Sequence, residues 1–209
     1  MDVVVISDTH NMYSNLKLPK ADMLICCGDM LGSGSLGQLT MFNEWLIKQP
    51  FTYKIVIAGN HDWCFQNNKH SSRNILENKN IIYLQDESVT IDGINFYGSP
   101  QTPFFFDWAF NVQRGEAIKQ YWDKIPNDTD VLITHGPPYG VLDVVPRNNE
   151  HVGCEELLLA VERVNPKYHL FGHIHNGYGR YQSEHTTFIN ASICTEEYRP
   201  TNKYMEFSI

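Results

Sequence analysis

Side chains of the types that bind divalent metal ions follow five short apolar runs of this sequence. They are carboxylates, imidazoles and one amide, and they comprise Asp8, His10, Asp29, Asn60, His61, Asp62, His135, His173 and His175. Oxygen ligands occur here together with imidazole nitrogens and without a thiolate. This donor set suits Mn²⁺, Fe, Zn²⁺ or Co²⁺ better than Ca²⁺ or an iron–sulfur cluster.

The apolar runs explain how residues so distant in sequence meet. Residues 3–6, 23–27, 55–58, 131–133 and 169–171 are typical of strands buried on both faces. In α/β sheets, ligands gather beyond the carboxyl ends of the strands, and buried carboxylates without a counter-charge waste desolvation free energy. We therefore expect two divalent ions. In the proposed arrangement Asp8, His10 and His175 bind the first ion, Asn60, His135 and His173 bind the second, and Asp29 bridges both.

Each motif alone is open to an ordinary structural explanation. Asp8-Thr9-His10 is compatible with a turn that Asp8 caps, and Gly28-Asp29 with a simple turn. The His173/His175 pair is compatible with a structural role. Gly59-Asn60-His61-Asp62 is a stronger signal, because these polar residues leave a buried strand together. The five motifs in order are specific as a set.

Helical and extended segments alternate between the motifs. Residues 35–48, 116–125 and 154–164 have apolar side chains at helical spacing, and a proline follows each. Residues 88–98 predict a hairpin with an Asp-Gly turn, and residues 178–182, 187–190 and 204–207 predict further strands. This alternation predicts an α/β fold with one mixed sheet or two stacked sheets and helices outside.

Composition narrows the class of protein. The 209 residues predict a single domain over residues 1–209. A net charge of −8 disfavours binding to long nucleic acid or to an anionic membrane surface. No apolar run suits a membrane span, and the N-terminus lacks the pattern of a secretory signal. The five cysteines show no CxxC spacing, so we expect free, mostly buried thiols and a cytoplasmic location.

The five motifs resemble the signature blocks of the calcineurin-like metallophosphoesterases. The resemblance rests on residues 8–10, 28–29, 59–62, 135–138 and 172–175 and extends over nearly the whole chain. It implies a four-layer α/β/β/α sandwich of two mixed sheets flanked by helices. It also implies the ligand assignment proposed above, and two divalent ions, with Mn²⁺ as our expected metal.

A narrower resemblance is to the animal metallophosphoesterase-domain proteins, a subfamily described as class III cyclic-nucleotide phosphodiesterases. Residues 53–61, 97–100, 135–138, 152–154 and 189–192 carry it. Some animal members have Gly at the position of His173, and a filled position implies a more competent enzyme. The resemblance and the acidic charge together imply hydrolysis of small phosphodiesters, including 2′,3′-cyclic nucleotides.

The expected mechanism is direct attack on phosphorus by a hydroxide shared between the two ions. His61 would protonate the leaving oxygen, and Asp62 would hold the His61 ring. Asn60, His61 and Arg147 are the candidates for binding substrate, although a solvated loop charge is the favoured explanation of Arg147. Two other functions remain open: a phosphomonoesterase or nuclease using the same site, and a non-catalytic scaffold with the same fold.

Aromatic side chains gather after Pro103, namely Phe104, Phe105, Phe106, Trp108 and Phe110. One or two of them are candidates for stacking a nucleobase beside the metal site. For most of the five we expect burial in a hydrophobic cluster or a contact between copies.

Overall fold

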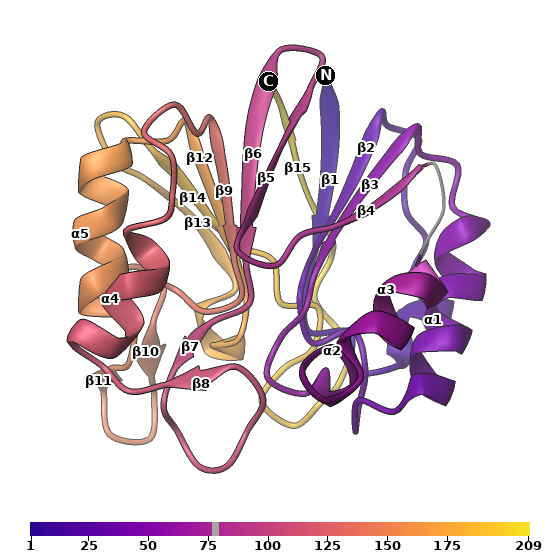
Figure 1. Ribbon diagram of the computed structural model, residues 1–209, viewed down its shortest axis with the longest axis horizontal. Helices are drawn as coiled ribbons and strands as arrows, with labels where there is room; N and C mark the ends of the chain where they lie inside the picture. Colours follow the sequence, from indigo (N-terminus) through magenta and orange to yellow (C-terminus); the bar gives the residue numbers. More distant parts are fainter. Residues whose placement is uncertain (77–79) are drawn as a thin grey trace.

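Two mixed β-sheets pack face to face in the middle of the protein, and helices cover their outer faces (Figure 1). The computed structural model describes residues 1–76 and 80–209. The first sheet has the order β15-β1-β2-β3-β4, with β15 (Met205–Ser208), β1 (Asp2–Ile6), β2 (Met23–Cys27), β3 (Tyr53–Ile57) and β4 (Ile81–Tyr83). The second has the order β13-β14-β12-β9-β6-β5, with β13 (Gly179–Gln182), β14 (Thr187–Asn190), β12 (Tyr168–Phe171), β9 (Val131–Thr134), β6 (Ile94–Ser99) and β5 (Glu87–Ile91). The expected four-layer sandwich is confirmed.

Parallel pairing brings the carboxyl ends of the central strands to one end of the molecule. β1, β2, β3 and β4 are parallel neighbours in the first sheet, as are β6, β9, β12 and β14 in the second. The sheets meet just beyond these ends, where Ser7 forms an isolated parallel bridge with Ser192. Both chain termini lie at the opposite end of the molecule (Figure 1).

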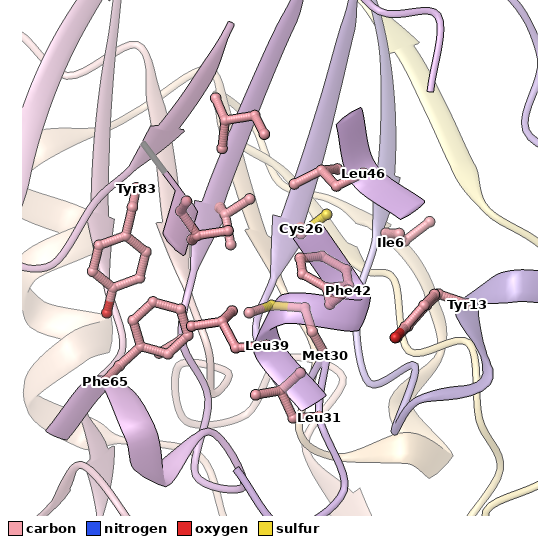
Figure 2. Packing of buried hydrophobic residues seen from close by; sticks show 14 of the residues in the cluster. Ile6, Tyr13, Cys26, Met30, Leu31, Leu39, Phe42, Leu46, Phe65 and Tyr83 are labelled. Atoms are coloured by element: carbon pink, nitrogen blue, oxygen red, sulfur yellow. The ribbon is translucent and has the colours of Figure 1, made fainter. Parts of the chain in front are cut away.

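Alternate side chains of each central strand enter different cores. In β1, Val3 and Val5 pack into the core between the two sheets, which also includes Phe96 and Ile133. Val4 and Ile6 instead face the outer helices. Figure 2 shows this outer core, in which side chains of β1 and β2 meet the helix that begins at Leu36. Burial on both faces is the physical reason for the continuous apolar runs.

Five α-helices are present in the described residues, three beside the first sheet and two beside the second (Figure 1). They are α1 (Leu36–Ile47), α2 (Trp63–Asn67), α3 (Lys69–Leu76), α4 (Glu116–Trp122) and α5 (Glu155–Val164). The predicted helices 35–48 and 154–164 are confirmed as α1 and α5. The predicted helix 116–125 was too long, because α4 ends at Trp122. No helix in the described part of the chain has the length and apolar character needed to cross a membrane.

Short elements surround the end where the central strands terminate. β7 (Thr102–Pro103) pairs with β8 (Asn111–Val112), and β10 (Val144–Val145) forms a hairpin with β11 (Glu150–His151). Single 3₁₀ turns follow β1 and β12, at η1 (Met12–Asn15) and η2 (His175–Gly177). The predicted 88–98 hairpin is present as β5–β6, and the five cysteines are buried free thiols, as expected.

Candidate metal centre

The predicted ligand residues lie in loops directly after five parallel strands. Asp8 and His10 follow β1, Asp29 follows β2, Asn60 follows β3, His135 follows β9, and His173 and His175 follow β12. Three groups of these side chains bring their ligand atoms within 4.8 Å of one another: Asp8/His10/His175, His10/Asp29/His61 and Asp29/His135/His173. Residues from both halves of the sequence therefore converge on one place.

The first group is closely packed around a buried carboxylate. His175 Nε2 lies 3.4 Å from Asp8 Oδ1 and 3.3 Å from His10 Nε2. Asp8 Oδ1 is buried and receives no hydrogen bond in the described structure, whereas Oδ2 accepts hydrogen bonds from the His173 amide and the Ser192 hydroxyl. A buried carboxylate oxygen without a partner, facing two imidazole nitrogens, fits a divalent cation.

Asp29 connects the first group to the second. Its Oδ2 lies 4.0 Å from His10 Nε2 and 3.4 Å from His135 Nε2. His135 Nε2 also lies 2.9 Å from Asn60 Oδ1. Because one carboxylate oxygen faces both groups of imidazoles, the residues present fit the expected pair of ions with Asp29 between them.

Backbone carbonyls orient two of the imidazoles. His135 Nδ1 lies 2.9 Å from the Cys27 carbonyl oxygen, and His175 Nδ1 lies 2.8 Å from that of Thr195. Each carbonyl requires a proton on Nδ1, so when the imidazolium gives up its second proton the lone pair is left on Nε2. Such a second contact is the usual way in which proteins orient metal-binding histidines.

Several ligand residues have strained backbone conformations. The φ angles of Asp8, His10, Asp29 and His173 are 52°, 42°, 52° and 66°. Residues with a Cβ atom rarely adopt this left-handed region, and such strain concentrates at functional sites. The sharp reversals after the strands turn these side chains towards one another.

Close packing of glycines completes the centre. A Cβ atom at Gly59 would collide with the Asp29 carboxylate, and one at Gly172 would collide with the carboxylate of Asp8. Only a residue without a side chain permits these approaches. The Gly-Asn and Gly-His pairs of the sequence motifs therefore have a steric basis.

Burial and close charges shift the pKa values of the candidate ligands. Burial alone would raise the pKa of Asp8, but His175 and the other imidazoles hold it well below its usual range. Burial alone would lower the pKa of His135, but the Asp29 carboxylate, together with other nearby groups, has the larger effect and raises this pKa to about 9. Burial and the charge of His135 lower the pKa of His173 to about 4. Ionised carboxylates and a neutral His173 are the forms that bind metal.

The expected role of Asp62 is wrong. In the described structure no hydrogen bond joins its buried carboxylate to the His61 ring, and the two oxygens accept instead from the amides of Leu31 (3.0 Å) and Gly59 (2.8 Å). Burial and the charge of Asp29 raise the pKa of Asp62 to about 8. The His61 ring is held instead by the Gly32 carbonyl, whose oxygen lies 2.8 Å from Nδ1. The side chain of Asp62 points back into the loop because two buried amides require an acceptor there.

A cavity of about 960 Å³ opens above the ligands. Arg147, on the β10–β11 hairpin, lines it together with Asn60 and His61, so the candidate substrate-binding residues share one cavity. Sequence reasoning missed Tyr198, whose ring centroid lies 4.7 Å from that of His10 and whose φ angle is 56°. No motif marks Tyr198, which lies in the turn after Thr195, where its amide donates to the Thr195 carbonyl (2.8 Å).

The aromatic residues after Pro103 divide into three sets. Phe104, Phe105 and Phe106 are exposed and line the cavity. Phe110 is buried, and Trp108 stacks on His61. The expected burial of most of the five is wrong, because the β7–β8 loop projects beyond the two sheets (Figure 1). The other expectation, a contact between copies of the chain, stays a prediction.

Comparison with known proteins agrees with this geometry. A family model described as calcineurin-like phosphoesterase matches residues 1–177. The chain belongs to the calcineurin-like phosphoesterase family, and it carries clusters of Asp and His side chains that are able to hold metal ions.

Relatives cover most of the chain. It is 43% identical over 223 residues to metallophosphoesterase domain-containing protein 1 of Homo sapiens. The aligned region covers 95% of this chain and 68% of that protein. It is 41% identical over 210 residues to UPF0046 protein K07C11.7 of Caenorhabditis elegans, and the aligned region covers 94% of this chain and 71% of that protein. Among solved structures, TT1561 of Thermus thermophilus has a TM-score of 0.63 at 13% identity, covering 90% of this chain and 88% of that one. This last likeness concerns the fold alone.

Proposed function

We propose that this protein is a phosphodiesterase that binds two divalent ions, with Mn²⁺ as the expected metal, and hydrolyses small phosphodiesters. Cyclic nucleotides, including the 2′,3′ kind, are the proposed substrates. The observation that carries the proposal is the position of the Asp29 carboxylate, which faces His10 on one side and His135 on the other. Bound divalent ions lower the pKa of a coordinated water and neutralise phosphoryl oxygens during in-line displacement.

His61 is the proposed acid for the leaving oxygen. Its Nδ1 atom is engaged with the Gly32 carbonyl, so Nε2 is the nitrogen free to carry a proton to the substrate. Its backbone amide donates to Asp29 Oδ1 (2.8 Å), which ties the main chain of His61 to the proposed bridging residue. The general acid contributes by neutralising charge on the departing oxygen.

The cavity supports a small substrate. Its volume of about 960 Å³ lies within the range of roughly 300–1,000 Å³ that is usual for small-molecule sites. The net charge of −8 opposes binding of long polyanions. Arg147 is the proposed phosphate contact on the rim. Buried free thiols support the proposed cytoplasmic location.

A substrate panel with added Mn²⁺ tests the proposal. We expect turnover of an aryl phosphodiester and of 2′,3′- or 3′,5′-cyclic nucleotides, and much slower turnover of the matching aryl monoester. Turnover of the monoester alone would replace the diesterase by a phosphomonoesterase using the same site.

Two further measurements separate mechanism from mere binding. A chiral thiophosphate diester should yield inverted configuration at phosphorus, because no protein nucleophile takes part. Retention would contradict direct attack. Less than one divalent ion per chain, together with no gain in activity on adding Mn²⁺, would favour a non-catalytic scaffold.

A further inference from the structure

The indole of Trp108 lies flat against the imidazole of His61. The two ring centroids are 4.3 Å apart and the planes are inclined by 26°. The same imidazole and the His10 ring form a T-shaped pair, with 4.7 Å between the centroids and 75° between the planes. A stacked neighbour on the face and an edge contact restrict the tilt of the ring, which the single hydrogen bond to Gly32 leaves free.

The main chain holds Trp108 in this position. The amide of Ala109 donates to the carbonyl of Asn60 (3.2 Å), so neighbours of the two stacked residues are hydrogen-bonded to each other. The amide of Phe110 donates to Gln66 Oε1 (2.7 Å), and both Ala109 and Phe110 are buried. The loop is therefore fastened next to His61 on the side from which the indole approaches.

Other aromatic residues of this loop behave differently. Phe105 and Phe106 contact each other, with ring centroids 4.3 Å apart. Their side chains are 61% and 70% exposed, whereas Trp108 is half-buried. Stacking on His61 is thus a property of Trp108 and not of the loop as a whole.

We propose that Trp108 is the positioning residue for His61, in the place that sequence reasoning gave to Asp62. The Gly32 carbonyl fixes Nδ1, the indole fixes the plane of the ring, and the direction of Nε2 follows from the two together. The inference rests on the proposed function, in which Nε2 carries the proton to the leaving oxygen. Trp108 acts through His61 and needs no contact with the substrate.

Removal of the indole should therefore lower the rate of hydrolysis more for some substrates than for others. A departing group that needs its proton suffers most from a misplaced acid, whereas a good leaving group departs without help. Misplacement of a reacting group by about 1 Å costs up to roughly a hundredfold in rate. Trp108→Ala should therefore lower kcat roughly tenfold to a hundredfold for a poor leaving group and much less for a good one.

The kinetic test compares two diesters that differ only in the leaving group, methyl 4-nitrophenyl phosphate and methyl phenyl phosphate. Both are assayed with added Mn²⁺. Trp108→Ala should lower kcat more for the phenyl ester, with KM little changed, and Trp108→Phe should restore most of it. In a His61→Ala background, Trp108→Ala should have no further effect. An equal loss on both esters, or an additive double variant, would overturn the proposal.

Trp45→Ala is the matched control. Trp45 is a half-buried indole on α1 that packs against Tyr13 and Phe42 at 5.1 and 5.7 Å, so its loss also removes aromatic packing. It should leave the ratio of the two kcat values unchanged. If Trp45→Ala changed the ratio as Trp108→Ala does, the effect would be general destabilisation and the proposal would fail.

A second measurement needs no activity. In metal-free protein with ¹⁵N-labelled histidine, the Nδ1 proton of His61 should give a resonance protected by the Gly32 carbonyl, identified by its loss in His61→Ala. Trp108→Ala should broaden or abolish it, and Trp108→Phe and Trp45→Ala should retain it. An unchanged resonance in Trp108→Ala would overturn the positioning role. Absence of turnover on any diester would instead overturn the proposed function, so the two failures are distinguishable.

Discussion

The carboxylate of Asp29 accepts a hydrogen bond from the backbone amide of His61, with 2.8 Å between Oδ1 and the nitrogen. The other oxygen, Oδ2, faces His10 and His135. One side chain thus contacts both proposed ion sites and the main chain of the proposed acid. Changes at Asp29 should therefore affect metal binding and proton delivery together.

Asp29→Asn separates these two effects. The amide oxygen still accepts from the His61 backbone, but the negative charge that faces His10 and His135 is lost. We expect metal affinity to fall by at least about a hundredfold, which exceeds the usual cost of losing an outer contact to a metal ligand. Metal analysis after dialysis, with turnover measured at rising Mn²⁺, checks this. Wild-type metal content in Asp29→Asn would contradict the bridging role.

His61→Ala distinguishes an acid from a ligand. We expect turnover to fall by roughly 10²–10⁴, the usual contribution of a general acid, while the metal content stays unchanged. The geometry makes this a demanding test, because a ring nitrogen of His61 lies within 4.8 Å of ligand atoms of His10 and Asp29. If the variant lost its metal, His61 would be a ligand and the assigned role would be wrong.

Asp62→Ala should damage the fold of the loop. It leaves the buried amides of Leu31 and Gly59 without an acceptor, and each unsatisfied amide costs about 1–3 kcal/mol. We expect the free energy of unfolding to fall on the order of 3 kcal/mol, as measured by urea denaturation of the metal-free protein. Unchanged stability together with a changed dependence on leaving group would restore the ring-holding role.

His169 should make the protein less stable in acid. Thr134 Oγ1 donates to the Gly136 carbonyl (2.7 Å), so at the 2.8 Å contact His169 Nε2 must be the donor. Nδ1 is buried and has no partner in the described structure. Burial lowers the pKa of His169 to about 3 from the usual 6.5. Below pH 6.5 the unfolded chain therefore binds a proton at His169 that the folded protein does not bind. The contribution of the neutral imidazole to the free energy of unfolding is fully present above pH 6.5 and is lost as the pH falls towards 3.

Chemical denaturation at several pH values measures this effect. Between about pH 6 and pH 4, the wild type should lose up to about 1.4 kcal/mol per pH unit more than His169→Leu, which has no proton to bind there. Both proteins are compared without metal, so the titration of the metal ligands cancels in the difference. Equal pH slopes would contradict the assignment of a neutral, buried imidazole.

Strands were well predicted because burial on both faces leaves an unbroken apolar run. The bounds of β2 (Met23–Cys27) match the prediction, and those of β3 (Tyr53–Ile57) differ by one or two residues. Helix ends were less predictable. Residues 123–125 form a turn rather than a continuation of α4, since the residue before Pro126 disfavours helical geometry. α3 was missed because its buried side chains are only Ser72 and Leu76, and the Ser72 hydroxyl bonds to Cys64, a contact that no periodicity reveals.

The convergence of the candidate site was predictable for a different reason. Residues that follow parallel strands share an edge of the fold, so Asp8 and His135 meet although their sequence positions are distant. Side-chain direction was not predictable. Asp62 follows His61 directly, yet buried amides turn its carboxylate away from the ring. Trp108 comes from a remote loop, and the hydrogen bonds of Ala109 to Asn60 and of Phe110 to Gln66 hold that loop beside the ring.

The divided origin of the ligands has a consequence for assembly of the protein. Asp8, Asp29 and Asn60 follow strands of the sheet formed mainly by the first half of the chain, whereas His135, His173 and His175 follow strands of the other sheet. Neither half alone encloses a complete centre. Ions bound in the proposed centre would join the two sheets as a cross-link does, and they would bind the native state in preference to the unfolded chain. The melting temperature should then rise with the concentration of free metal and fall when a chelator is added. The same side chains would therefore serve both the proposed catalysis and the resistance of the protein to heat.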